Sequence, residues 1–150
     1  ELAGKRDLDV HLRHGVVRGS SIDLTPLRAT TISGQIGAPL QLPDGRLLAF
    51  VVDRGQPGTT TLWWSHDRGQ SWPEENHCVV YVHDERAALS QGRENVDFKQ
   101  YWEDMGKWSF GHPAIRLLGD GRVLLAWYAG TPDCMSLHWA RLQLHGGVSR

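Results

Sequence analysis

The chain has 150 residues, of which 16 are basic and 17 acidic, and its formal net charge is −1. This length fits one ordinary domain, and the balanced charge excludes a strong field for nucleic acid or anionic membranes. No apolar run approaches 18 residues, so the sequence predicts no membrane span. Two cysteines do not make a disulfide framework. We expect Cys78 and Cys134 to be two half-buried thiols, with one disulfide as the alternative.

The first predicted strand runs from Asp9 to Val17, as an outer strand of a preceding sheet or a closing strand. A connection follows over Thr30–Gly37. Four strands come next, each bounded by turn residues. They are predicted at Pro39–Leu42, Leu47–Val52, Thr60–Ser65 and Cys78–Val82.

Part of this pattern is repeated. The segment Gly37–Phe50 recurs as Gly111–Trp127, and both copies read strand, Asp-Gly turn, strand. Asp-Gly between two apolar runs is a strong hairpin signal. A third strand follows each copy, and Trp63 and Trp139 fall at matching places in it. The second copy has three strands and stops near Leu144.

The second strand of each copy, Leu47–Val52 and Val123–Tyr128, is apolar on both of its alternating faces. A sheet open to water on one face alternates apolar with polar residues. Both strands are therefore expected to be covered on both sides. Helical periodicity is poor, and only Asp84–Gln91 has a local helical pattern. The sequence predicts an all-β fold of antiparallel four-stranded units.

A motif with the pattern S-x-D-x-G-x-x-W follows the third strand of the first copy. Asp67 can accept hydrogen bonds from nearby backbone N–H groups, and Gly69 can adopt a positive φ without steric cost. Ser65 adds a hydroxyl to the same network, and Trp72 can lie under the hairpin and seal it. An ordinary hairpin turn is the alternative interpretation.

This motif resembles the Asp-box, or bacterial neuraminidase repeat, of sialidase-superfamily β-propellers. The resemblance covers about Ser33–Leu144. It implies the C-terminal portion of a partial, six-bladed propeller in one domain over residues 1–150. Residues 1–32 would end a preceding blade, 33–82 form a blade with the Asp-box, 83–107 form a long inter-blade loop, and 108–145 form a final incomplete blade.

Propellers have about four to eight blades, and two open blades would leave long unpaired edges. We therefore expect the remaining blades to come from a missing N-terminal part of a longer polypeptide. The competing interpretation is a compact two-sheet sandwich made of this chain alone.

The resemblance also implies that the Asp-box and Asp-Gly turns lie opposite the working face, so that the box residues are structural. The working face would hold the loops at the other end, above all His83–Gly111. Charged and aromatic residues suit a sugar site, and paired carboxylates serve most glycoside hydrolysis. A solvated loop is the alternative. The catalytic candidates are Glu85, Glu103, Asp104 and His112, and the substrate-binding candidates are Arg54, Arg86, Trp102, Trp108 and Tyr128.

Sialidases use a Tyr nucleophile, and the resemblance implies a Glu beside it, an Asp acid/base and three Arg. Residue by residue, most of this set is absent. Ala38 stands near the position of one Glu, and Trp127–Tyr128 near that of another. His112 occupies the Tyr position, where it could act as acid, base or ligand, or simply bond the backbone. Arg54 matches an Arg that ends a strand in the family.

The predicted function is a sialidase-like propeller that acts on or recognises a glycan or glycoconjugate, as a divergent exo-glycosidase if it is catalytic. The alternatives are a non-catalytic carbohydrate- or protein-binding propeller and a fragment without activity of its own. No cofactor is predicted. No metal site is predicted either, since His11 and His14 would face opposite sides of a strand. An exported location follows from the resemblance alone.

Overall fold

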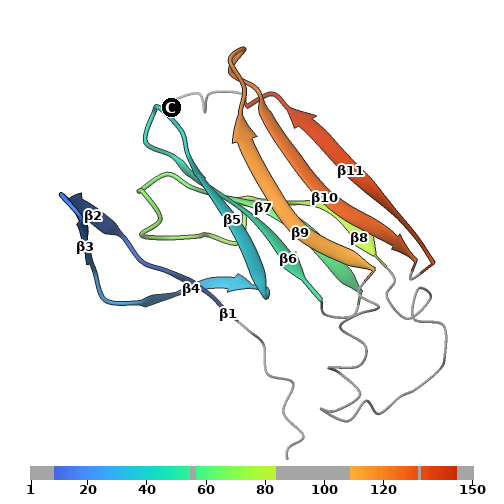
Figure 1. Ribbon diagram of the computed structural model, residues 1–150, viewed down its shortest axis with the longest axis horizontal. Helices are drawn as coiled ribbons and strands as arrows, with labels where there is room; N and C mark the ends of the chain where they lie inside the picture. Colours follow the sequence, from blue (N-terminus) through green and yellow to red (C-terminus); the bar gives the residue numbers. More distant parts are fainter. Residues whose placement is uncertain (1–8, 55–56, 84–108, 132, 145–150) are drawn as a thin grey trace, which may run out of the picture.

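The computed structural model describes residues 9–54, 57–83, 109–131 and 133–144, and these residues form antiparallel β-structure (Figure 1). An N-terminal hairpin comes first. Its strands are β1 (Asp9–Leu12), β2 (Gly15–Arg18), β3 (Ser21–Leu24) and β4 (Arg28–Ser33). A four-stranded sheet follows, with β5 (Ile36–Gln41), β6 (Leu47–Asp53), β7 (Gly58–Ser65) and β8 (His77–His83). A three-stranded sheet contains β9 (Phe110–Leu117), β10 (Val123–Thr131) and β11 (Cys134–Leu142).

The all-β fold is therefore confirmed, as are the seven strands predicted for the two copies. The N-terminal region differs from the prediction. The strand expected over Asp9–Val17 is broken into β1 and β2 at Arg13–His14. The segment expected as a connection, Thr30–Gly37, instead contains the end of β4, which pairs with β1, and the start of β5. Thr30 stabilises that pairing because its hydroxyl donates to the Val10 carbonyl at 2.6 Å.

The two Asp-Gly turns are structurally equivalent. In the first, Leu42 N–H donates to Arg46 O at 2.8 Å, and Gly45 N–H donates to Leu42 O at 3.0 Å. The second turn, residues 118–122, repeats both bonds at the same lengths. The two turn glycines have φ values of 90° and 78°, a conformation that favours glycine. The internal repeat is thus a repeat of backbone structure as well as of sequence.

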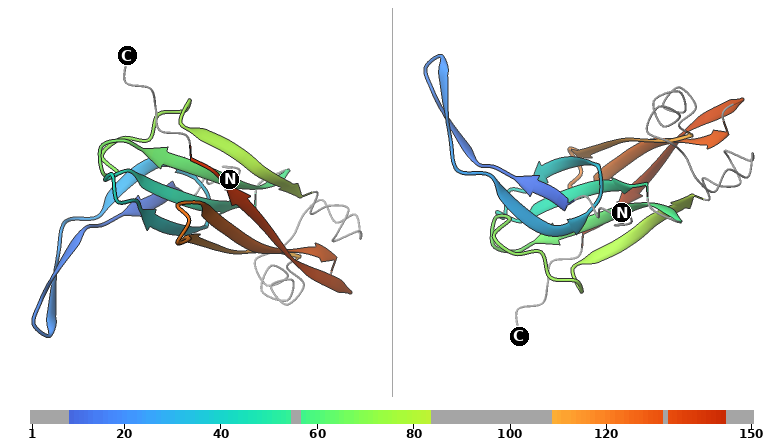
Figure 2. Two further views of the ribbon diagram at one scale, coloured as in Figure 1. Left: turned by 90° about the horizontal axis from the view of Figure 1, so that it is seen from above. Right: turned by 90° about the horizontal axis from the view of Figure 1, so that it is seen from below.

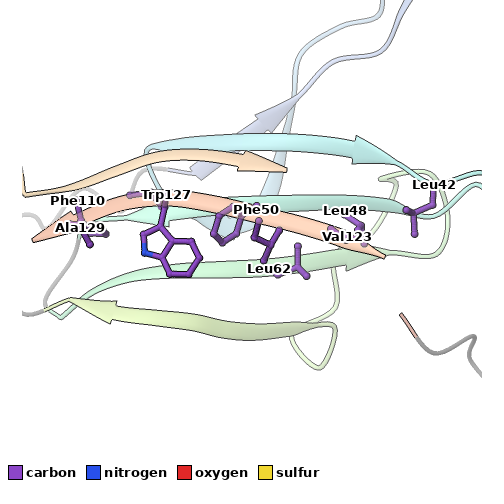
Figure 3. Packing of buried hydrophobic residues seen from close by; sticks show 10 residues of the cluster. Leu42, Leu48, Phe50, Leu62, Phe110, Val123, Trp127 and Ala129 are labelled. Carbon is purple, nitrogen blue, oxygen red and sulfur yellow. The ribbon is translucent and has the colours of Figure 1, made fainter. Parts of the chain in front are cut away.

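The four-stranded and three-stranded sheets pack face to face through one apolar layer (Figure 3). Phe50 of β6 and Trp127 of β10 meet in its middle, edge to face, with ring centroids 5.8 Å apart. Such a pair adds to the free energy gained by burial alone. The fully or nearly fully buried members are Leu42, Leu48, Phe50, Val52, Leu62, Phe110, Val123, Leu125, Trp127 and Ala129.

A second, smaller cluster lies on the opposite face of the four-stranded sheet. Ala49 and Val51 of β6 pack there with Trp63 and Trp72, under Ile32 of β4. Strand β6 is therefore covered on both faces, as its sequence predicts. Figure 2 shows the N-terminal hairpin crossing this side of the sheet before it extends away from the molecule.

The corresponding prediction for β10 is wrong. Its alternate residues Leu124, Ala126 and Tyr128 are only half-buried, because no described element covers that face of the three-stranded sheet. Trp139 lies on the same open face opposite Ala126 and is 66% exposed, whereas Trp63 is 7% exposed. The two tryptophans match in sequence, but they do not lie on equivalent faces of the repeat. Trp63 pairs with Ala49, whereas Trp139 pairs with Ala126, which is equivalent in sequence to Phe50 and not to Ala49.

The two sheets are small and neither closes on itself. Adjacent propeller blades and the two layers of a sandwich share this face-to-face packing.

Cys78 and Cys134 are free and exposed, so the expectation of half-buried thiols is wrong. The described residues include no helix of sufficient length and apolar character to cross a membrane.

The S-x-D-x-G-x-x-W motif forms a compact hydrogen-bonded turn after β7. Ser65 Oγ donates to Asp67 Oδ1 at 2.6 Å and accepts from Gly69 N–H at 2.7 Å. Ser71 donates to Asp67 twice, through its N–H at 2.9 Å and its hydroxyl at 2.6 Å. The bond from Ser65 first, and those from Ser71 next, lower the pKa of Asp67 well below its ordinary value. Trp72 is buried beneath the turn.

Removal of the Phe50 ring from the apolar layer should destabilise the packing of the two sheets. We expect Phe50→Ala to lower the free energy of unfolding by about 3–5 kcal/mol, because it leaves a cavity in the apolar layer. Urea denaturation of the purified protein measures the loss. The control is Val79→Ala at a half-exposed site on β8, and equal losses in the two variants would contradict the packing described here.

The Asp67 turn should make stability depend on pH in one direction. Since the pKa of Asp67 is lower in the folded chain, its carboxylate stabilises the fold above the ordinary pKa of about 3.9. That contribution is lost as the pH falls. We expect the wild type to lose more stability than Asp67→Asn between about pH 6 and about pH 2, as followed by urea unfolding.

The variant Ser71→Ala provides the matched comparison, because it removes one of the two hydroxyl donors to Asp67. Its loss of stability on acidification should lie between those of the wild type and Asp67→Asn. Parallel curves for all three proteins would mean that the turn does not hold an ionised carboxylate.

Candidate functional site

The strands have two unlike ends. The register pairs Leu47 with Ser65, which places the Asp44–Gly45 turn and the Ser65–Trp72 turn at one end of the four-stranded sheet. Asp53 and Thr59 pair at the other end, where β6 leads into Arg54. Strand β9 begins at this second end and β10 finishes there. Candidate residues from both sheets meet at this end.

Arg54 reaches from the four-stranded sheet to the three-stranded sheet. Its backbone N–H donates to Gln35 Oε1 at 2.5 Å, which fixes the start of the loop. Its side-chain Nη2 donates to the carbonyl oxygen of Phe110 at 3.2 Å. The guanidinium carbon lies 6.0 Å from the centroid of the Phe110 ring, at the outer limit of a cation–π contact. Arg54 as a whole is half-buried, and its guanidinium is held between the two sheets.

Asp53 belongs to the same hydrogen-bond network. Its carboxylate accepts from Ser33 Oγ at 3.0 Å and from Gln35 Nε2 at 3.3 Å. Gln35 thus connects Asp53 to Arg54 through the two ends of its amide. Because Ser33 ends β4 and Gln35 precedes β5, this network ties the N-terminal hairpin to the end of β6.

Gly111 makes room for Arg54 and Tyr128. A Cβ atom at Gly111 would lie 2.5 Å from Arg54 Nη2 and 3.3 Å from the Tyr128 hydroxyl, and the φ of Gly111 is 151°. The guanidinium and the phenol therefore approach the same point of the β9 backbone. Only glycine leaves that space open in this conformation.

His112 adopts an unusual backbone conformation beside these groups. Its φ is 47°, in the left-handed region that costs an L-residue about 1–2 kcal/mol. Its exposed ring lies 5.3 Å from the Tyr128 ring, centroid to centroid, at 37° between planes. Backbone strain of this kind concentrates at functional sites. The site therefore offers a guanidinium, a phenol hydroxyl and an exposed imidazole within one small area.

Three of the predicted site residues, Arg54, His112 and Tyr128, are brought together by the fold. The other candidates, Glu85, Arg86, Trp102, Glu103, Asp104 and Trp108, lie outside the described residues. The box residues Ser65, Asp67, Gly69 and Trp72 lie at the opposite end of the strands. In the described part of the chain, no three His, Cys, Asp or Glu side chains are close enough to hold a metal ion.

Sequence reasoning missed a second polar cluster at the same end. His83 Nε2 lies 2.8 Å from Ser109 Oγ, and His83 Nδ1 lies 3.0 Å from the Tyr81 hydroxyl. This order resembles a nucleophile, a base and an orienting group. However, Ser109 is 0% exposed and His83 6% exposed, so the hydroxyl does not reach solvent. No local motif marks this cluster, because His83 and Ser109 are 26 positions apart.

Comparison of the chain with protein-family models, with curated proteins and with solved structures found no match.

The close contact at Gly111 predicts a specific effect of one methyl group. We expect Gly111→Ala to displace the Arg54 guanidinium and to lower the free energy of unfolding by about 1–3 kcal/mol, because alanine is strained at this φ. Urea denaturation and the Arg54 Nε–H resonance in an NMR spectrum measure the two effects. Gly119→Ala is the control, since a Cβ there meets nothing within 4 Å. An unshifted Arg54 resonance would contradict the contact.

Proposed function

We propose that the protein recognises an acidic glycan at the end of its strands where Arg54, His112 and Tyr128 meet. The observation that carries the proposal is the approach of the Arg54 guanidinium and the Tyr128 hydroxyl to the same point of the backbone, beside an exposed and strained His112. The groups come from different sheets, so the site depends on how the two sheets pack.

The chemistry of these groups fits a sugar that carries a carboxylate. A guanidinium pairs with carboxylates through parallel hydrogen bonds, and a phenol hydroxyl can donate to or accept from sugar hydroxyls. The tilted rings of His112 and Tyr128 offer apolar faces next to these donors. The contact of Arg54 with Phe110 holds the guanidinium in place before a ligand arrives, which lowers the entropic cost of binding.

The resemblance to sialidase-type propellers supports the same class of ligand. In this interpretation the two sheets are neighbouring blades, and the Asp-box turn closes one of them away from the binding end. The equivalent Asp-Gly turns and the hydrogen-bonded Ser65–Ser71 turn support it. That further blades come from a preceding part of the polypeptide remains a prediction.

Binding, not hydrolysis, is the activity that the described residues support. Most glycoside hydrolysis needs two carboxyl groups that flank the scissile bond. The carboxylate in the Arg54 network is Asp53, and it is already engaged by Ser33 and Gln35. A hydrolytic role would depend on Glu85, Glu103 or Asp104.

Calorimetric titration with sialyllactose and with lactose tests the proposal. We expect the protein to prefer the acidic sugar, and Arg54→Met to weaken that binding by at least about tenfold, because a charged hydrogen bond is lost. Tyr128→Phe should cause a smaller loss. Arg116→Met, at an exposed site on β9, is the matched control and should bind as the wild type does.

Equal affinity for the two sugars, or undiminished binding by Arg54→Met, would contradict the proposal. An assay with aryl sialosides distinguishes catalysis. Sugar release that disappears in Glu103→Gln or Asp104→Asn would replace recognition with hydrolysis as the function.

His112 allows function to be separated from stability. Glycine adopts the left-handed conformation of this residue without steric cost, so we expect His112→Gly to leave the free energy of unfolding within about 1 kcal/mol of the wild-type value. Binding of sialyllactose should nevertheless weaken, because the imidazole is lost. Urea denaturation and calorimetry check the two parts, and unchanged binding would remove His112 from the site.

A further inference from the structure

A cavity lies between the N-terminal strands and the four-stranded sheet. Strands β1 and β4 cross one side of this sheet (Figure 2), and the space between them and strands β5 and β6 measures about 300 Å³. This volume is at the lower end of the range for small-molecule sites. Most of the wall is apolar, and its larger apolar members are Val10, Leu12, Ile32, Pro39, Leu47 and Trp72.

Small residues of the sheet contribute to this space. Gly37 of β5 and Ala49 of β6 both line the cavity, so these two strands add little side-chain volume there. Asp9 and His11 of β1 also belong to the lining, and both are exposed. The cavity therefore has a route to solvent beside β1.

One buried donor in the wall has no partner. Trp72 is 6% exposed, and its indole Nε1–H makes no hydrogen bond to any described residue. The ring edge that carries Nε1 also carries Cζ2, since both atoms are bonded to Cε2. Trp72 Cζ2, Leu12 Cδ2 and Leu47 Cδ2 all lie within 3.5 Å of one point, the position of a Cβ atom built on Gly69. The donor edge therefore lies beside Leu12 and Leu47, which line the cavity.

The half-buried polar side chains of the wall already have partners. Thr30 Oγ1 donates to the Val10 carbonyl at 2.6 Å, and Gln35 uses both ends of its amide in the network described above. A buried donor without an acceptor is costly, and an ordered water needs several polar partners. Trp72 Nε1 thus offers one hydrogen bond within an otherwise apolar space.

We propose that this cavity binds a small neutral molecule, about one ring in size, that has a single hydrogen-bond acceptor such as a ketone or ether oxygen. An apolar cavity of about 150 Å³ holds benzene, so about 300 Å³ accommodates one ring with a substituent. The apolar wall contacts the ring, and Trp72 Nε1–H donates to the oxygen. Burial of an unpaired charge would be costly, so the ligand is neutral. The proposal does not depend on the recognition of an acidic glycan.

NMR titration with two ligands of matched shape tests the proposal. Cyclohexanone and methylenecyclohexane differ in that only the ketone has an acceptor. We expect cyclohexanone to bind roughly threefold to tenfold more tightly, which is the net contribution of one neutral hydrogen bond. It should also shift the Trp72 Nε1–H resonance downfield in a saturable manner. That resonance is assigned as the one that Trp72→Phe lacks.

Two variants separate the donor from the space. Trp72→Phe keeps an aromatic ring and removes the donor, so it should bind the two ligands with equal affinity. Ala49→Leu fills part of the cavity and should bind neither. Val79→Ala, at an exposed site on β8 outside the lining, is the control and should bind both ligands as the wild type does. Urea denaturation checks that each variant keeps its fold.

Three results would overturn the proposal. Absence of saturable cyclohexanone binding to the wild type would mean that the cavity is not a ligand site. Equal affinity of the wild type for the two ligands would mean that Trp72 Nε1 does not donate to the occupant. Cyclohexanone binding that persists in Ala49→Leu would place the ligand outside this cavity. The wild-type and Ala49→Leu measurements decide the matter even where Trp72→Phe fails to fold.

Discussion

The apolar layer between the four-stranded and three-stranded sheets holds the two sheets together. Phe50 and Trp127 meet edge to face within it, and the residues around them are almost fully buried. This packing sets how the two sheets lie against each other. It therefore determines that the end of β6 lies next to the start of β9, where Arg54 can reach Phe110 and Gly111. Without the layer, Arg54 of one sheet would not be brought together with His112 and Tyr128 of the other.

The two ends of the strands differ in how they are held, and this difference explains what the sequence could predict. The bonds within the Ser65–Trp72 turn join residues no more than four positions apart, so a short motif predicts the shape of the turn. Two longer bonds, from Arg28 Nη2 to Gly69 O and from Thr31 Oγ1 to Trp72 O, tie the turn to β4 and have no local signal. The Asp-Gly turns are equally local. At the other end, Arg54 bonds to Gln35, 19 positions away, and to Phe110, 56 positions away. Arg54, His112 and Tyr128 could be named as candidates, but their meeting at Gly111 depends on sheet packing.

The errors of prediction have the same origin. The strand β4 was missed because its pairing with β1 depends on a partner across a long hairpin. The sequence of β10 is apolar on both faces, but apolar character alone does not supply a covering layer, and the face with Ala126 is left open. The buried contact of His83 with Ser109 joins two segments that have no shared motif. In each case a distant contact, not a local preference, decides the outcome.

The two repeated sheets pack face to face and thereby assemble the Arg54 site. Nuclear Overhauser effects in an NMR spectrum of the chain can detect this packing. The structure predicts cross-peaks between the ring protons of Phe50 and Trp127, whose centroids are 5.8 Å apart, and between the α-protons of Gly58 and the ring of Phe110, which are in close contact. Strong cross-peaks within each sheet with none between the two sheets would mean that the sheets do not pack against each other.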